Sequence, residues 1–591
     1  MRAGKASAMD EQQAVIRIDD LTFTYPGAEE PALRNVSLSI DKGDFVAIIG
    51  GNGSAKSTLC KTMNGLIPHF YTGDYAGEVT IAGLRTDEHS VSELSRHVGY
   101  VYQDFENQLV RPTVLDDASF APLNYGMRNY KERGMQALAM VGLDASPREF
   151  IWQLSGGQKH LLALAGAVSL GPDILIVDEP IAQLDPCHAR EIYELLRRFN
   201  EQHGMTIIVI EHHTEFIADY CEHVVLMAGG RLVWKKPVHE ALNQVGELLC
   251  HDVFPPQVTQ AAHRMHGSHG RLPVTLEEAE QYFGPVNGSV PAAADVLAVP
   301  ELIRRDQPVV TTEAASFSYK TVERGKKPVL REVSLSFYPG EQVALVGNNG
   351  AGKSSLLRLI TGVTKPESGS VHVKGIDTRR TSPESLADLV TYIYQNPEDM
   401  FIEDSIRKDV EFFLKARKVV GYQEKVDRIL SSFNLTGLQE RDGRLLSGGQ
   451  QRRASLAIGV AMDPSIILLD EPTASLDIAT RKDIVSMLAE VRRHVDTVII
   501  ATHDMQLVAE WASRIIVMHE GQVIHDGTRE SVFGDPYLLA QAGLTAPQIV
   551  ELSRRMGMQP LCYTVEEFAA RCRAGREEEV ARNGAGAQAI G

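Results

Sequence analysis

Short apolar runs that lead into glycine-rich or acidic segments recur along the chain. The residues QVALVG at 342–347 predict a buried strand, and SLLRLITG, after the glycine-rich segment GNNGAGKSS, has the apolar spacing of a helix. FVAIIG at 45–50 starts a similar series earlier in the chain. ILIVDE at 174–179 and IILLDE at 466–471 predict two buried parallel strands, each ending in two acids. The pattern therefore indicates strands whose chemically active residues follow at the strand ends.

The chain contains the same series of motifs twice. SGGQ occurs at 155–158 and again at 447–450, an offset of 447 − 155 = 292, and DEP at 178–180 and 470–472 repeats with the same offset. The lysines of the two glycine-rich segments lie 353 − 56 = 297 residues apart, so the first copy has 297 − 292 = 5 extra residues, which we place in the loop 68–77. A period this long is that of a whole domain and not of a solenoid repeat.

The repeat and the changes in composition divide the chain into two copies, each followed by a small, mostly helical appendage. VTLEEAEQYF at 274–283 resembles YTVEEFAARC at 563–572, so both appendages belong to the repeat. NGSVPAAADVLAVP, between the copies, contains proline and is nearly uncharged, which is typical of a linker. The expected boundaries are 14–245 for the first copy, 246–286 for its appendage, 287–307 for the linker, 308–535 for the second copy, 536–578 for its appendage and 579–591 for a disordered tail.

Composition and charge narrow the class of protein. With 591 residues, 43% hydrophobic and 23% charged, the chain is long enough for two or more globular domains. Its formal charge of 59 − 77 = −18 argues against nucleic acid as the main partner. Six cysteines without paired spacing favour a reducing compartment over disulfides or a zinc site. No apolar run reaches the roughly 20 residues that span a bilayer, and the N-terminus lacks a signal-peptide pattern, so any membrane role is expected to be peripheral.

The segment GNNGAGKSS has the pattern of a phosphate-binding loop. It lies between a predicted strand and a predicted helix, which is the context that this motif requires. Its glycines let backbone N–H groups converge on phosphate, and the N-terminus of the following helix favours negative charge. Lys353 would reach the terminal phosphates, and Ser354 would bind Mg²⁺. The residues expected to hold nucleotide in this copy are Gly347, Asn348, Asn349, Gly350, Ala351, Gly352, Lys353, Ser354 and Ser355.

The first copy, GNGSAKST, departs from this pattern at one position. Ala55 stands where the glycine before the lysine belongs. Alanine keeps the N–H group, so the loop could still cradle phosphate if the backbone φ is negative here, whereas the methyl group could also crowd the nucleotide. A working site and a weakened or non-hydrolysing site both remain open. The corresponding nucleotide residues are Gly50, Asn52, Gly53, Ser54, Ala55, Lys56, Ser57 and Thr58.

The two strands that end in acids supply residues for hydrolysis. The first acid, Asp178 or Asp470, is placed to hold Mg²⁺ through water, and the second, Glu179 or Glu471, to polarise the attacking water. Taken alone, such acids could merely cap the next element. Beside a phosphate loop, the catalytic role is favoured.

Each SGGQ turn precedes a strong helical pattern and so forms a second helix N-terminus suited to an anion. Such a turn cannot reach the γ-phosphate that the distant loop of its own copy holds, so we expect it to act on the partner copy. The residues of the two turns are Ser155, Gly156, Gly157, Gln158, Ser447, Gly448, Gly449 and Gln450.

With these motifs the chain resembles the ATP-binding-cassette ATPases over nearly its whole length outside the linker and the appendages. The resemblance implies an α/β fold class: two P-loop (RecA-like) cassette domains, each with a helical subdomain, which close head-to-tail on two ATP molecules. In this family an aromatic residue stacks on adenine, which matches Tyr25 and Tyr319; each could instead be a half-buried strand aromatic.

The resemblance also assigns the residues around the γ-phosphate. A glutamine that senses Mg²⁺ and water matches Gln103 and Gln395, and a histidine that contacts the γ-phosphate matches His212 and His503. The loop that communicates across the dimer matches Asp185 and Asp477. The expected catalytic residues are Glu179, Glu471, His212 and His503, and the expected Mg²⁺ residues are Ser57, Gln103, Asp178, Ser354, Gln395 and Asp470.

Exchange of residues between the copies gives two composite sites within one chain. Site one joins the Lys56 loop to the turn at 447–450, and site two joins the Lys353 loop to the turn at 155–158. Because site two has the unaltered loop, we predict that it carries most of the turnover. Replacing Glu471 with alanine should then lower ATPase activity more than the same change at Glu179.

An acidic, amide-bearing segment follows each sensing glutamine, in YVYQDFENQLV and YIYQNPEDMFI. These segments and GLTAPQIVELSRRMG in the second appendage resemble the ATPases of energy-coupling-factor importers, where fused two-motor versions occur in cobalt- and vitamin-type importers. The resemblance implies integral membrane partners, namely a coupling protein and a substrate-binding membrane protein, and a location at the cytoplasmic face of the cell membrane. The alternative is a soluble tandem cassette acting on ribosomes or DNA, which usually has a basic charged linker or clustered cysteines; this sequence has neither.

His263, His266 and His269 form an H-x-x-H-x-x-H run that invites a metal-binding interpretation. The second copy has Arg554 and Gly557 at the first two equivalent positions, and a spacing of three only partly follows one helix face. A solvated surface is therefore the favoured interpretation.

Overall fold

The computed structural model of the chain describes residues 14–181, 184–267, 270–284, 307–320, 325–473 and 478–575. The chain divides into two compact units, residues 1–282 and 283–591. The predicted tail, and all but the last residue of the predicted linker, lie outside the described residues. Both units combine sheets with helices, so the predicted α/β fold class is confirmed.

The strands of the first unit form two sheets. They are β1 (Ala14–Thr24), β2 (Leu33–Asp41), β3 (Phe45–Ile49), β4 (Asp74–Ile81), β5 (Leu84–Arg85), β6 (Val98–Val101), β7 (Ile174–Asp178), β8 (Thr206–Ile210), β9 (His223–Ala228) and β10 (Arg231–Pro237). The smaller sheet is antiparallel, in the order β2-β1-β4-β5. The larger has the order β10-β9-β3-β8-β7-β6 and is parallel except at β10.

The larger sheet of the first unit is buried on both faces. Along β3, Phe45, Ala47 and Ile49 belong to one apolar cluster, and Val46 and Ile48 belong to another. Successive side chains of a strand point to opposite faces, so a strand covered on both sides is apolar at every position. This is why FVAII appears in the sequence as an uninterrupted apolar run.

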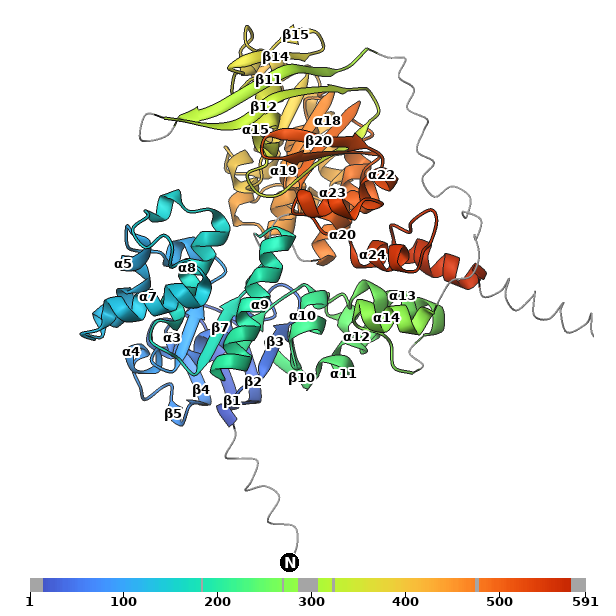
Figure 1. Cartoon of the computed structure of the whole chain (residues 1–591). Coiled ribbons are helices and arrows are strands. Elements are labelled where there is room, and N and C mark those ends of the chain that lie inside the picture. Colours follow the sequence, from blue (N-terminus) through green and yellow to red (C-terminus); the bar gives the residue numbers. More distant parts are fainter. Residues whose placement is uncertain are drawn as a thin grey trace, which may run out of the picture. The chain divides into compact units, whose positions relative to one another are not determined.

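The helices of the first unit lie between and after its strands along the chain. They are α2 (Lys56–Met63), α3 (Leu66–His69), α4 (Val91–Leu94), α5 (Val114–Ala118), α6 (Phe120–Asn124), α7 (Tyr130–Val141), α8 (Gly156–Val168), α9 (Pro186–His203), α10 (Thr214–Tyr220), α11 (Val238–Leu242), α12 (Val245–Cys250), α13 (Gln257–His266) and α14 (Leu276–Phe283), with 3-10 turns η1 (Phe105–Gln108) and η2 (Ile151–Gln153). Helices α5 to α8 pack on one another and form a helical subdomain (Figure 1).

The second unit repeats this topology. Its strands are β11 (Val310–Lys320), β12 (Lys326–Phe337), β13 (Gln342–Val346), β14 (Ser368–Val373), β15 (Ile376–Asp377), β16 (Val390–Ile393), β17 (Ile466–Asp470), β18 (Thr497–Thr502), β19 (Arg514–His519) and β20 (Gln522–Gly527). The sheets have the orders β12-β11-β14-β15 and β16-β17-β18-β13-β19-β20, which match those of the first unit strand for strand.

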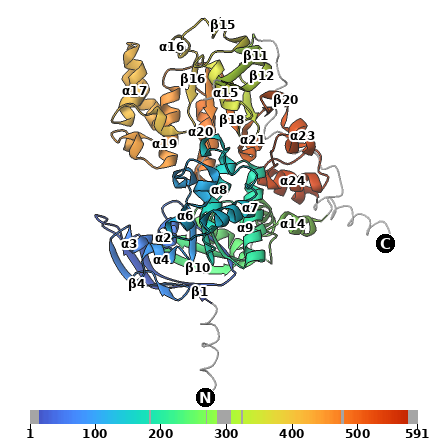
Figure 2. The ribbon, with the colours of Figure 1, turned by 60° about the vertical axis from the view of Figure 1, so that its left-hand side comes forward.

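Most helices of the second unit correspond to helices of the first, but none among the described residues corresponds to α3. They are α15 (Lys353–Ile360), α16 (Pro383–Leu386), α17 (Ile406–Ala416), α18 (Tyr422–Ser432), α19 (Gly448–Val460), α20 (Ile478–Val491), α21 (Met505–Trp511), α22 (Arg529–Phe533), α23 (Pro536–Gln541) and α24 (Gln548–Arg555), with 3-10 turns η3 (Pro397–Met400), η4 (Thr436–Leu438) and η5 (Gly443–Leu445). Helix α19 packs against α17 and β16 (Figure 2). No helix among the described residues is both long and apolar enough to cross a bilayer.

Candidate active sites

The two phosphate loops lie between β3 and α2 and between β13 and α15, where the sequence predicts them. In each loop the lysine folds back over the loop. Lys56 Nζ donates to two carbonyl oxygens at the start of its loop at 2.8 and 3.1 Å, and Lys353 Nζ does the same at 2.7 and 3.3 Å. Both lysines are buried. Each ammonium group is thus held beside the backbone cradle that the phosphates would occupy.

The loops differ in backbone strain at the residue before the lysine. Ala55 has φ 73°, in the left-handed region, and Gly352 has φ 100°. The negative φ under which an alanine would be harmless is therefore not present. A non-glycine residue in this region costs roughly 1–2 kcal/mol. At Gly352 a Cβ would also lie 2.7 Å from Leu330 and 2.9 Å from the carbonyl oxygen of Val329.

Gly352→Ala is expected to lower the free energy of unfolding of the second unit by about 1–2 kcal/mol, because it adds the same left-handed strain and a close contact. Ala55→Gly removes the strain in the first copy and should stabilise it by up to about 1 kcal/mol, less the entropy that glycine adds to the unfolded chain. Scanning calorimetry of the full chain measures both changes. Stabilisation by Gly352→Ala would contradict this account.

The first acids of the two pairs occupy equivalent positions beside the loops. Asp470 accepts hydrogen bonds from Ser354 Oγ at 2.9 Å and Tyr392 OH at 2.6 Å. Asp178 accepts one from Tyr100 OH at 3.3 Å, and Ser57 bonds to the same carboxylate. Burial raises the pKa of both aspartates, and these hydrogen bonds oppose the shift. A carboxylate and a hydroxyl held together are oxygen donors of the kind that Mg²⁺ binds.

The two tyrosines that bond to these aspartates were not predicted from the sequence. A signal was present, because Tyr100 and Tyr392 are 392 − 100 = 292 residues apart and both stand three residues before the sensing glutamine. The repeat therefore marks them as part of the site, although only the fold brings each ring to its aspartate.

The second acid of the second copy lies in a buried cluster of charges. The carboxylate of Glu471 is 3.5 Å from Lys353 Nζ, accepts from Thr502 Oγ1 at 3.1 Å, and is 3.0 Å from His503 Nδ1. Burial would raise the pKa of Glu471, but the charges of His503 and Lys353 lower it to about 2. Burial lowers the pKa of His503 while Glu471 raises it, with a net rise. Glu471 is therefore ionised and fixed in place.

The equivalent acid of the first copy has different partners. Glu179 accepts a hydrogen bond from Gln103 Nε2 at 2.7 Å and lies 3.3 Å from His212 Nε2. Its side chain is 20% exposed, compared with 9% for Glu471. Both glutamates have a left-handed backbone, with φ 49° and 44°. Strain of this kind is often found at functional residues.

A buried acid next to His212 was not predicted. Glu211 accepts hydrogen bonds from the backbone N–H groups of His212 at 2.7 Å and His213 at 2.9 Å, and from Tyr193 OH at 2.9 Å. Burial would raise the pKa of Glu211, but His213 and these backbone donors lower it. The second copy has Thr502 at this position, and Glu471 itself accepts from the N–H of His503 at 3.3 Å.

The two candidate adenine-binding tyrosines lie next to the helices that follow the phosphate loops. Tyr25 OH is 3.3 Å from Thr58 Oγ1, and Tyr319 OH is 3.3 Å from Ser355 Oγ. Arg358 also donates to Tyr319 OH at 3.4 Å. The rings therefore stand beside the loops, and their stacking on adenine stays a prediction.

Both SGGQ turns begin helices, as predicted. Ser155 is the N-cap of α8, and a capping box joins it to Gln158 through bonds of 2.9 and 3.3 Å. Ser447 and Gln450 form the same box at the start of α19. The N-caps and the first glycines are exposed. Their backbone N–H groups are thus available to an anion.

The remaining predicted residues lie in three different settings. Gln395 is exposed, and no counterpart of the Gln103–Glu179 bond is found among the described residues. Asp185 is buried and caps α9 by accepting from His188. Asp477 and His269 lie outside the described residues. His263 and His266 are on α13. Among the described residues, the group whose ligand atoms lie close enough together to hold a metal ion is Asp44, Glu222 and His223. Asp44 already pairs with Lys235 at 3.2 Å.

Known proteins are similar to this chain over most of its length. A family model described as ABC transporter matches residues 33–182 and 330–474. An ABC transporter ATP-binding protein of Methanosarcina mazei is 31% identical over 561 residues, covering 93% of this chain and 95% of its own. One of Caldanaerobacter subterraneus is 31% identical, covering 94% and 98%. Among solved structures, cbiO1 of Clostridium perfringens, part of the ABC transporter complex cbiONQ, is 29% identical over 40% of this chain and 95% of its own, with a TM-score of 0.36.

The two matched regions contain both phosphate loops, both SGGQ turns and both pairs of acids. The sequence relatives cover more than nine tenths of the chain, so the similarity extends to the tandem arrangement. The chain therefore belongs to the ABC transporter family as a tandem ATPase, with two ATP-binding cassettes in one polypeptide.

Proposed function

We propose that this chain is the ATP-hydrolysing subunit that energises a membrane importer of the energy-coupling-factor type, of the vitamin or transition-metal class. Its partners are an integral membrane coupling protein and a substrate-binding membrane protein, and the chain acts at the cytoplasmic face of the membrane. ATP and Mg²⁺ bind in the two composite sites, site one with the Lys56 loop and site two with the Lys353 loop. Closure of the cassettes moves the gripped membrane helices, and hydrolysis releases them.

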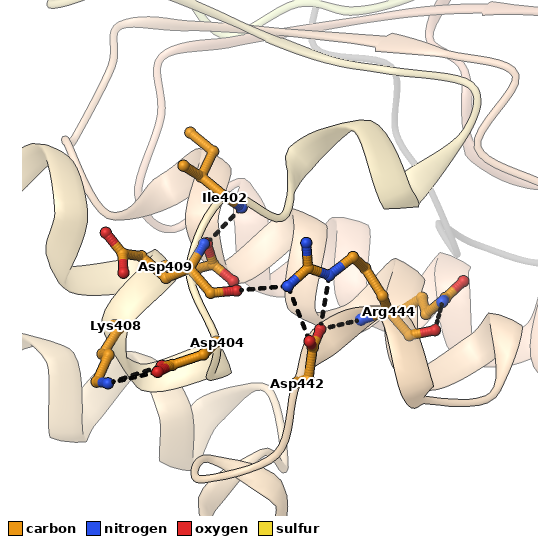
Figure 3. A network of polar contacts seen from close by, with 8 residues as sticks. Ile402, Asp404, Lys408, Asp409, Asp442 and Arg444 are labelled. Carbon is orange, nitrogen blue, oxygen red and sulfur yellow. Dashed lines mark hydrogen bonds and ion pairs between the residues drawn. The ribbon is translucent and has the colours of Figure 1, made fainter.

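The observation that carries the proposal is an exposed apolar residue held in the same way in both copies. Val110 and Ile402 follow the sensing glutamines, and each is 57% exposed. Asp117 accepts from the N–H groups of Val110 and Arg111, both at 2.8 Å, and Asp409 accepts from those of Ile402 and Glu403 at the same distance. Figure 3 shows Asp409 beside Ile402.

These two aspartates are themselves buried, and burial raises the pKa of each. A buried acceptor for two backbone N–H groups fixes the path of the segment, because leaving those groups unpaired would be costly. The fold therefore keeps an apolar side chain in water seven residues after each sensing glutamine. A rigid apolar tip on the helical subdomain suits contact with a helix of a membrane partner.

The surroundings of the two tips differ in chemistry. In the first copy Phe150 and Trp152 stack with ring centroids 4.5 Å apart and are 42% and 61% exposed. At the equivalent positions the second copy has Asp442 and Arg444, an ion pair at 2.8 Å, and Arg444 also donates to the carbonyl oxygen of Glu403 at 3.3 Å (Figure 3). The two cassettes thus offer unlike surfaces, which suits two unlike coupling segments of a membrane partner.

Val110→Asp and Ile402→Asp are expected to abolish recovery of the chain with membranes while the ATPase activity of the purified chain changes by less than about twofold. A charge on the tip must be desolvated when a partner helix covers it, which costs several kcal/mol. The measurement is co-purification of tagged chain with detergent-solubilised membrane proteins from the native cell, with the proteins identified by mass spectrometry.

Ile376→Asp supplies the matched control, because Ile376 is an exposed isoleucine on β15, away from the helical subdomain. It should leave membrane recovery intact. Recovery of ribosomes or DNA instead of membrane proteins, unaffected by the tip variants, would favour the soluble tandem cassette and reject the importer.

A further inference from the structure

The main chain around the sensing glutamine is held differently in the two copies. In the first copy Gln108, at the end of η1, donates from Nε2 to the carbonyl oxygen of Tyr100 at 2.9 Å and accepts from the N–H of Tyr102 at 3.2 Å. Both bonds are local, since the side chain lies within eight residues of its partners. The equivalent position of the second copy, 108 + 292 = 400, is Met400 and cannot make them.

In the second copy a residue of the SGGQ helix bonds to this segment instead, at other backbone groups. Arg452 of α19 donates from Nη1 to the carbonyl oxygen of Tyr394 at 2.9 Å and from Nη2 to that of Gln395 at 2.7 Å. The partners are 58 and 57 residues away in sequence. Arg452 is only 1% exposed, and it is the largest fully buried side chain among the described residues.

A buried guanidinium is costly unless its donors are paired. Nη1 and Nη2 of Arg452 have these two backbone partners, whereas Nε has no hydrogen-bond partner among the described residues. Burial lowers the pKa of Arg452 to about 10 and the charge of Asp470 opposes the shift, so the group stays protonated at neutral pH. The same side chain thus joins two parts of the second copy, the SGGQ helix and the backbone at Gln395.

The first copy lacks this connection at the same helix position. His160 stands where 452 − 292 = 160 places the arginine, 2% exposed and stacked on Phe105 with ring centroids 4.5 Å apart. Burial lowers the pKa of His160 to about 4, so the ring is neutral. Both copies also have one side-chain contact between the SGGQ helix and the segment that follows the sensing glutamine. Lys159 pairs with Glu106 at 2.9 Å, and Gln451 donates to Glu398 at 3.4 Å.

We propose that Arg452 is a positioning residue that ties the backbone at the sensing glutamine of the second copy to its SGGQ helix. Movement of α19 and binding of Mg²⁺ at Gln395 are then linked through two buried hydrogen bonds that His160, at the same position of the first copy, does not make. Gln395 belongs to site two, whereas the turn before α19 belongs to site one. If the composite sites hold, Arg452 connects the two sites; this consequence rests on the proposed function, but the tie itself does not.

The test compares Arg452→Gln with His160→Gln in the full, purified chain. Arg452→Gln removes the charge and at least one of the two buried bonds, so backbone amides at 390–400 should exchange with deuterium about tenfold faster. Amides at 98–108 should be unchanged. In steady-state phosphate release, the Mg²⁺ concentration for half-maximal rate should rise about tenfold by the same loss. His160→Gln should change neither quantity.

A second substitution that restores slow exchange distinguishes a positioning role of Arg452 from a general effect on stability. Met400→Gln supplies the second copy with the local bonds that Gln108 makes in the first, so the Met400→Gln/Arg452→Gln double variant should regain slow exchange at 390–400. Arg452→Lys, which can still reach one carbonyl oxygen, should be intermediate. Unchanged exchange and Mg²⁺ dependence in a folded Arg452→Gln chain would overturn the proposal. So would a double variant that recovers its melting temperature but not its slow exchange. None of these readouts requires a membrane partner, so their outcome is independent of the importer assignment.

Discussion

Glu471→Gln should lower steady-state phosphate release by about 100-fold, which is the usual effect of removing a residue that aligns and polarises the attacking group. Glu179→Gln should lower it by less than about threefold. The difference follows from the phosphate loops, because the loop beside Glu471 has Gly352 at φ 100° and the loop beside Glu179 has Ala55 in a strained left-handed conformation.

The surroundings of the two glutamates also favour a larger catalytic contribution from Glu471 than from Glu179. Glu471 is held ionised by Lys353, Thr502 and His503. Glu179 is more exposed and accepts a bond from Gln103. Glutamine keeps the shape of the side chain, so both variants should still bind ATP, and equilibrium binding of labelled ATP controls for a general defect. Equal losses in the two variants would reject the asymmetry.

Gly156→Asp in the first SGGQ turn should be as damaging as a change in the Lys353 loop, with phosphate release reduced by about 100-fold, as for loss of a charge-stabilising donor. Under the proposed composite arrangement this turn would face the γ-phosphate of site two, and a carboxylate there would repel it. Gly448→Asp, the matched change in the second turn, affects only site one and should cost less than about threefold.

Gly156→Asp should fold normally, because a Cβ at Gly156 would meet no neighbouring atom within 4 Å. An acid in the first turn of a helix is also favoured by the helix dipole. Circular dichroism and the melting temperature should therefore be unchanged. If Gly448→Asp were the damaging variant and Gly156→Asp harmless, each cassette would use its own turn, and the composite sites would be wrong.

Much of the fold and of the candidate sites could be predicted from the chain alone. The apolar runs at 45–49 and 342–346 became buried central strands, because a strand covered on both faces must be apolar at every position. The phosphate lysines, the acid pairs and the SGGQ turns all lie where local patterns put them. These motifs are short and contiguous, so the residues that make them recognisable are the residues that do the local bonding.

Contacts between distant segments could not be predicted in this way. The bonds from Tyr100 and Tyr392 to the aspartates span 78 residues each, and Glu211 bonds to Tyr193 across 18 residues. Which side chain reaches which backbone group depends on how β6, β7 and α9, or their counterparts, are packed, and nothing in the local pattern specifies it.

The sequence by itself determined that the chain has two copies of one ATPase cassette, because a repeat of many motifs at one offset needs no coordinates to be recognised. The tertiary structure decided how the copies differ. Residue identity does not fix φ, so only the fold placed Ala55 in the left-handed region. Likewise, His160 and Arg452 occupy the same position in the two copies, but only packing decided what each one does. His160 is a neutral ring stacked on Phe105, and Arg452 is a guanidinium that bonds to the backbone at Gln395.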